Sequence, residues 1–178
     1  MNYKYLKESN KEEIVNLFKS TFSASEGENE GDLIGDLVSN LSSVIDDKEI
    51  ICFGAYEGEK LIGSIFFTRL NFNQDIQIYM LAPVAISSNH QGDGVGQALI
   101  NHGLIELNKR LVSVVITYGD PAFYSKVGFQ SLSEDVIKAP LKLSTPEGWL
   151  GQSLSGENIP VINKRPRCVK EFNDPAYW

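Results

Sequence analysis

The segment from Leu81 to Ile100 constrains the fold of this chain more than any other. It runs from an apolar stretch, through a short polar turn, into a helical pattern that begins among three glycines at alternate positions 92, 94 and 96. Helix N-termini carry unpaired N–H groups and the positive end of the helix dipole, and together these bind anions. Because glycine leaves the backbone open to close approach, the segment predicts a site for a phosphate-bearing ligand.

Two common phosphate-binding loops also place glycines at the start of a helix. A P-loop needs a Gly-Lys-Ser/Thr run, which the chain lacks. The dinucleotide fingerprint is Gly-x-Gly-x-x-Gly near the start of a βαβ unit, whereas here the spacing is Gly-x-Gly-x-Gly in the middle of the chain. Both loops are disfavoured, and glycines that only shape a turn remain an open interpretation.

Two motifs resemble the GNAT superfamily of N-acetyltransferases. Read as Gln91-x-x-Gly94-x-Gly96, the loop is similar to that family's acetyl-CoA pyrophosphate loop, Arg/Gln-x-x-Gly-x-Gly/Ala. Downstream, a short helical stretch carries Tyr124 four residues before Gly128-Phe129, which resembles the family's next motif. The two motifs in this order are more specific than either alone, and the resemblance covers residues 45 to 130.

The resemblance implies an α/β fold with a mixed, mostly antiparallel sheet of about six to seven strands, in which strands four and five splay, flanked by about four helices. We expect one such domain over residues 1–178. The expected strands are 3–6, 50–56, 60–71, 76–86 and 112–117, with a hairpin turn at 57–59 and a return strand after residue 139.

Helix boundaries are predicted from local patterns. Ser9-x-x-Glu12 and Ser25-x-x-Glu28 both match the capping box that starts helices. Asp120-Pro121 is a strong start for a short helix, and Gly128 can end it. After the glycine loop, an apolar stripe at helical spacing is formed by Ile100, Leu104, Leu107 and Leu111.

Composition excludes several classes of function. The chain has 178 residues and a net charge of −7, which disfavours nucleic acid and membrane surfaces as partners. No apolar run approaches the roughly 18 residues of a membrane span, and the first residues lack the apolar core of a signal peptide, so we expect a cytoplasmic protein. Two cysteines and two histidines are too scattered for a metal site. An aromatic tail near the C-terminus is formed by Phe172, Tyr177 and Trp178. This tail could cover the site of the amine that accepts the acetyl group, contact a second subunit in a homodimer, or fray.

The resemblance implies acetyl-CoA as co-substrate and assigns residues to it. The backbone of the strand end would pair with the pantetheine arm, with an N–H near Val84 on the thioester oxygen, and the loop N–H groups would bind the pyrophosphate. Asp93 should point outward because a carboxylate repels phosphate. The residues expected to contact the cofactor are Val84, Ala85, Ile86, Gln91, Gly92, Asp93, Gly94, Val95, Gly96, Gln97, Asp120 and Phe123.

The implied activity is direct acetyl transfer to a primary amine of a small-molecule or peptide acceptor. By resemblance, Tyr124 is the general acid that protonates the departing CoA thiolate. A phenol has a pKa near about 10 and a thiol a pKa near about 8.5, so this proton transfer is only slightly unfavourable. Glu26, Glu28 and Glu30 lie where the family's first two helices meet the acceptor, and Glu28 and Glu30 are candidates for the base. The alternative is a non-catalytic CoA-binding regulatory or scaffold module.

Overall fold

The computed structural model describes residues 1–178. Its strands are β1 (Asn2–Tyr5), β2 (Ile50–Glu57), β3 (Lys60–Leu70), β4 (Ile78–Ile86), β5 (Val114–Tyr118), β6 (Gln130–Ser131) and β7 (Trp149–Ser153), and its helices are α1 (Lys11–Glu26), α2 (Glu28–Ser42), α3 (Val95–Lys109) and α4 (Pro121–Tyr124). The strands form one seven-stranded sheet in the order β1-β2-β3-β4-β5-β7-β6, and β4 and β5 are parallel. The predicted α/β fold with a mixed sheet is confirmed.

Contacts divide the chain into two compact units. The first comprises Met1–Phe67 and Pro83–Gly103, and the second comprises Thr68–Ala82 and Leu104–Trp178. The glycine loop belongs to the first unit, and the Tyr124 motif belongs to the second. The two halves of the predicted site are therefore described separately below.

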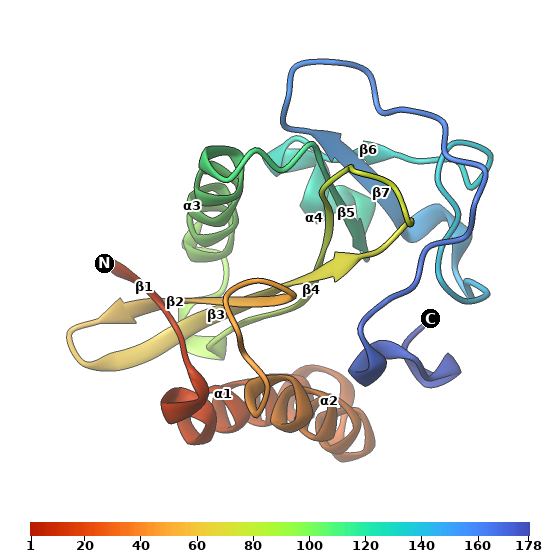
Figure 1. Ribbon diagram of the computed structural model, residues 1–178. Helices are drawn as coiled ribbons and strands as arrows, with labels where there is room; N and C mark the ends of the chain where they lie inside the picture. The colour runs from red at the N-terminus through yellow and green to blue at the C-terminus, as the bar shows by residue number, and fades with distance from the viewer. The chain divides into compact units, whose positions relative to one another are not determined.

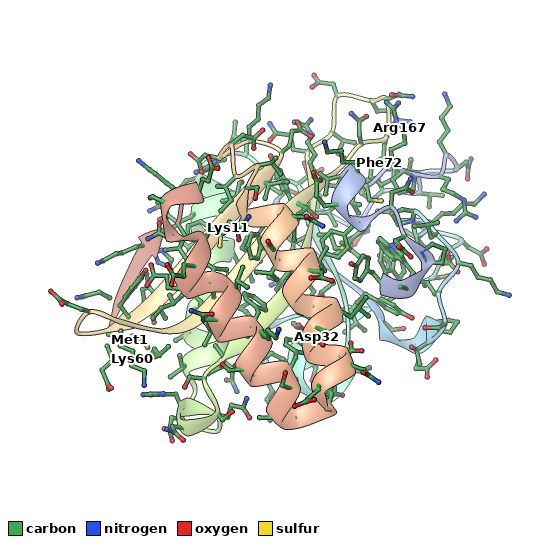
Figure 2. The ribbon with its side chains drawn as sticks, turned by 90° about the horizontal axis from the view of Figure 1, so that it is seen from below. Met1, Lys11, Asp32, Lys60, Phe72 and Arg167 are labelled. Carbon is green, nitrogen blue, oxygen red and sulfur yellow. The ribbon has the colours of Figure 1, made fainter.

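In the first unit, α1 and α2 form an antiparallel pair (Figures 1 and 2). Lys11 Nζ, at the start of α1, donates to Ser43 Oγ just after α2 at 2.7 Å, and Lys19 Nζ lies 2.9 Å from Asp32 Oδ1. The helices approach closely because Gly31 carries no side chain: an added Cβ would overlap the Ser23 hydroxyl.

Neither predicted capping box forms. Asn10, not Ser9, is the N-cap of α1, and its side chain accepts from Lys7 N at 2.9 Å and donates to Glu13 Oε1 at 2.8 Å. Ser25 lies inside α1, which continues to Glu26. The break between α1 and α2 is a single residue, Gly27, with φ +97°, so positive backbone torsion rather than a side-chain cap separates the two helices.

The predicted hairpin between β2 and β3 is confirmed, and Gly58 in its turn has φ +60°. Aromatic side chains fill the core of this unit. Phe18 on α1 contacts Phe66 on β3 with ring centroids 5.9 Å apart, and Phe53 contacts Phe67 edge-on at 6.0 Å. The helix pair is thus anchored on the strands by large apolar rings.

The second unit is built on β5. Its register with β4 runs from Ile78–Val114 to Leu81–Thr117, and β7 pairs with it antiparallel on the other side. The β4–β5 pairing ends at Leu81, before Pro83. Proline has no N–H to donate to a strand ladder, which fits an end of the pairing at this point. Figure 2 shows Phe72 and Arg167 near one another, where Asn71 and Arg167 form an antiparallel bridge.

One prediction at the edge of a helix is wrong, and one of the three alternatives for the aromatic tail is contradicted. Leu111 does not continue the apolar stripe of α3, because the helix ends at Lys109 and Leu111 has φ +62° with 82% of its surface exposed. The aromatic tail does not fray: Trp178 is buried, and its Nε1 donates to Phe172 O at 2.8 Å. None of the helices combines the length and the hydrophobicity that a membrane span requires.

Candidate active site

The glycine loop lies between β4 and α3 in the first unit. Gly92 and Gly94 have φ +85° and +79°, a region that other residues rarely adopt, and no atom lies within 4 Å of where a Cβ would be. The first helical hydrogen bond of α3 runs from Ala98 N to Gly94 O at 3.0 Å. The N–H groups of the residues between Gly94 and Ala98 therefore have no partner within the helix, and the two glycines that precede them are uncovered.

Side chains around the loop hold it in place. Gln91 Nε2 donates to Ile86 O at 3.0 Å, so the glutamine closes the base of the loop onto the end of β4. His90 Nε2 lies 3.4 Å from Glu57 Oε2 in the β2–β3 hairpin. Asp93 is exposed. The loop is thus pinned on both sides while its glycines stay uncovered.

The three candidate glutamates surround the break between α1 and α2. Glu26 is the last residue of α1 and is exposed, whereas Glu28 and Glu30 lie in the first turn of α2, where Glu30 is half-buried. Carboxylates in that turn complement the positive end of the helix dipole. They share the first unit with the glycine loop and carry negative charge that could attract a cationic ligand.

In the second unit, the Tyr124 motif forms the predicted short helix. Asp120 Oδ1 accepts from Ala122 N at 2.9 Å as the N-cap of α4, and Gly128 ends the following turn with φ +94°. The Tyr124 ring lies between Phe123, with centroids 5.0 Å apart, and Phe129, at 5.8 Å. The structure thus brings together Asp120, Phe123 and Tyr124.

Tyr124 is held protonated by its surroundings. Burial raises its pKa to about 12, the negative charge of Asp120 adds to this, and a hydrogen bond with the Thr117 side chain acts in the opposite direction. The phenol therefore keeps its proton throughout the neutral range, as a proton donor must, but it is a weaker acid than the unperturbed tyrosine assumed from sequence.

Sequence reasoning missed two residues of this cluster. Thr117 is fully buried, and its hydroxyl donates to Leu81 O at 2.7 Å besides bonding Tyr124. Gly119 leaves room for the phenol, since a Cβ there would lie 2.6 Å from Tyr124 Cε2. A threonine directly after the apolar run Val114–Ile116 was the available signal, because a buried hydroxyl needs a hydrogen-bond partner.

Comparisons with known proteins give the family. The model of the acetyltransferase (GNAT) domain matches residues 2–132. The N-acetyltransferase YjhQ of Escherichia coli K12 is 30% identical over 140 residues, 72% of this chain and 76% of that protein. YhbS of the same organism is 36% identical over 75 residues, which span only 44% of its length.

Solved structures agree on the fold. The crystal structure of the GNAT family N-acetyltransferase YhbS from E. coli in complex with CoA has a TM-score of 0.79 at 23% identity, covering 97% of this chain and 92% of that one. A GNAT family acetyltransferase from Brucella melitensis in complex with acetyl-CoA has a TM-score of 0.69 at 19% identity, covering 94% and 93%. The chain belongs to the GNAT acetyltransferase domain family.

Proposed function

We propose that the protein is an N-acetyltransferase that moves the acetyl group of acetyl-CoA to a primary amine. The observation that carries the proposal is the glycine loop, with unpaired N–H groups at the start of α3 and open space over Gly92 and Gly94. These features suit a pyrophosphate, which needs several backbone donors and no side chain in its way. The CoA and acetyl-CoA complexes of the two similar structures support this ligand.

Further residues have proposed roles in holding acetyl-CoA. The backbone of Val84–Ile86 would pair with the pantetheine arm, and the N–H groups of residues 91–97 would bind the pyrophosphate. Gln91 has one amide hydrogen engaged by Ile86 O and a second one free for a phosphate oxygen. Phe123, half-buried beside Tyr124, would line the arm, and Asp120 would act mainly by capping α4.

Tyr124 would give its proton to the sulfur as the C–S bond breaks. With the phenol near 12 and an ordinary thiol near about 8.5, the transfer is uphill by roughly 3.5 pK units, or about 5 kcal/mol. A desolvated sulfur would reduce this gap, because burial also raises thiol pKa values: it raises that of the Cys52 thiol to about 12. The pKa of the departing thiol would therefore match that of Tyr124 only if the sulfur were buried to a similar degree as the phenol.

The acceptor amine would be drawn by negative charge. Glu28 and Glu30 remain proposed candidates for the base that deprotonates it, acting directly or through water. A cytoplasmic location and a small-molecule or peptidyl amine as acceptor belong to the same proposal. The negative net charge of −7 favours such a cationic partner over an anionic one.

The test is to measure CoA binding by calorimetry and CoA thiol release from acetyl-CoA with a panel of polyamines, aminoglycosides and peptides. Tyr124→Phe should lower kcat by about a hundredfold or more with little change in CoA affinity, the usual scale for loss of a general acid. Tyr3→Phe, on the outer strand β1, is the matched control and should retain activity. Tight CoA binding without thiol release from any amine would instead support a non-catalytic CoA-binding module.

A further inference from the structure

His90 attaches the start of the glycine loop to a neighbouring hairpin. It directly precedes Gln91, the first residue of the loop motif, and its ring Nε2 lies 3.4 Å from Glu57 Oε2 at the end of β2. The side chain of His90 is 19% exposed, whereas that of Glu57 is 73% exposed. The imidazole is therefore held against the hairpin, while its carboxylate partner lies at the surface.

Backbone hydrogen bonds hold this ring in place. His90 N donates to Ser87 O at 2.8 Å, and Ser87 N donates to Ile62 O of β3, also at 2.8 Å. On the other side of the ring, Gln91 Nε2 donates to Ile86 O at 3.0 Å. The residues on both sides of His90 are thus fixed to β3 and β4, so the ring stays beside the hairpin.

The surroundings of the ring indicate its tautomer. Nδ1 is buried without a hydrogen-bond partner, so an N–H at that position would have no acceptor. A carboxylate only accepts hydrogen bonds, and the neutral ring therefore carries its hydrogen on Nε2 and directs it at Glu57. A second proton would enter at Nδ1 and turn this contact into an ion pair. The contact with Glu57 favours the charged ring, the unpaired Nδ1 disfavours it, and a bound anion nearby would add to the first effect.

The charge beside the glycine loop depends mainly on this pair. The charged residues on the segments that adjoin the ring are Glu57, Glu59 and Lys60 in the hairpin, Asp93 in the loop, and Glu13 on α1, which lines the same hollow as Ser87. Only Glu57 contacts the His90 ring. The helix that follows the loop, α3, has no Asp, Glu, Lys or Arg before Glu106. The His90–Glu57 pair is therefore negative when the ring is neutral and uncharged overall when the ring is protonated.

We propose that His90 is a positioning residue whose protonation tightens the binding of acetyl-CoA at the glycine loop, an inference that rests on the function proposed above. When the ring is neutral, the unbalanced charge of Glu57 repels the pyrophosphate. When the ring takes up a proton, it neutralises Glu57 and strengthens the attachment of the loop to the hairpin. Binding of the pyrophosphate and protonation of His90 therefore favour each other, because the two equilibria are linked.

Calorimetry with dephospho-CoA tests this coupling. The probe keeps the pyrophosphate but lacks the 3′-phosphate of CoA, which as a phosphate monoester titrates near about pH 6. The wild type should bind the probe about two- to fivefold more tightly at about pH 6 than at about pH 8 in low salt, which is the scale of an exposed charge pair. Titrations at about pH 6.5 in two buffers of different ionisation enthalpy should show a net uptake of protons on binding.

The chain has two histidines, and substituting each one isolates the contribution of His90. His90→Gln keeps an amide that can donate to Glu57 but cannot take up a proton, so its affinity should be equal at the two pH values, with no proton uptake. His102→Gln is the matched control. His102 lies on α3 and stacks on Tyr3 with ring centroids 4.6 Å apart, so this variant should keep the pH dependence of the wild type.

Two glutamates of the hairpin provide a second comparison. Glu57→Gln should bind dephospho-CoA at about pH 8 as tightly as the wild type does at about pH 6, because the charge of Glu57 is absent in one case and neutralised in the other. Glu59→Gln removes a charge of the same sign two residues away that does not contact the ring. This variant should leave the ratio of the two affinities unchanged.

Three results would overturn the role of His90. They are equal affinities of the wild type at the two pH values, a pH dependence that persists in His90→Gln, and a Glu59→Gln variant that behaves like Glu57→Gln, since general charge and not the contact would then be responsible. In each case the wild type would still bind the probe, and the proposed function would stand. If the wild type binds neither dephospho-CoA nor acetyl-CoA at any pH, the proposed function fails, and the role of His90 with it.

Discussion

Substitution of Gly94 by alanine tests the glycine loop most directly. Gly94 has φ +79°, and the space where its Cβ would stand is open, so the change in unfolding free energy comes from the backbone alone. A left-handed conformation costs a residue with a side chain roughly 1–2 kcal/mol. The reduced freedom of the unfolded chain offsets about 0.4–1 kcal/mol of this. We expect a net loss near 1 kcal/mol, which lowers Tm by about 2–4 °C.

The effect on ligand binding should be larger. The new methyl group would occupy the open space beside the unpaired N–H groups, where we propose that the pyrophosphate binds. Loss of one hydrogen bond to a charged group costs about 1.5–3 kcal/mol. Since 1.4 kcal/mol corresponds to a factor of ten, the Kd for CoA should rise by about ten- to a hundredfold, as measured by calorimetry.

Gly58 provides the matched control. It has φ +60° in the β2–β3 turn, and its Cβ position is also open. Gly58→Ala should therefore lose the same stability, yet bind CoA as tightly as the wild type. If the two variants bind CoA equally well, the loop is only a turn and the reasoning on the anion site is refuted.

Three further changes test single contacts. Asp93→Asn removes an exposed carboxylate from the loop and should tighten CoA binding about two- to fivefold at low salt, an effect that calorimetry should find weaker as salt screens it. Asp120→Ala removes the cap of α4 and should cost about 1 kcal/mol in denaturant unfolding. It should also lower the pKa of Tyr124 in a tyrosinate titration, because the Asp120 charge raises it. Gly31→Ala should cost about 1–3 kcal/mol by forcing α1 and α2 apart, and a double-mutant cycle with Ser23→Ala should recover part of the loss.

Each of these has an outcome that would contradict it. CoA binding that weakens in Asp93→Asn would mean that the carboxylate supports the loop. If the pKa of Tyr124 is the same in Asp120→Ala as in the wild type, the negative charge of Asp120 does not contribute to raising that pKa. Additive effects of Gly31→Ala and Ser23→Ala would show that the two residues do not compete for the same space.

Short-range features could be predicted because they depend on a few neighbouring residues. The helix that begins at the glycine loop, the Asp120-Pro121 start of α4 and the turn at Gly58 follow from local backbone rules and are confirmed. Helix boundaries were less predictable. Ser25 matches a cap pattern but lies within α1, because packing against α2 extends that helix to Glu26. The single domain over residues 1–178 and the roles of the site residues stay predictions.

The sequence by itself determined the family, the order of strands and helices, and the place of the glycine loop and Tyr124, since these follow from short motifs and hydrophobic spacing. Only the tertiary structure decided the acidities of Tyr124, whose pKa is raised, and of Tyr118, whose pKa is lowered. Tyr124 is half-buried beside Thr117, and the Tyr118 hydroxyl accepts from Thr145 N and donates to Thr145 Oγ1, 27 residues away along the chain. A pKa depends on burial and on partners that folding brings from distant segments, so no local pattern specifies it.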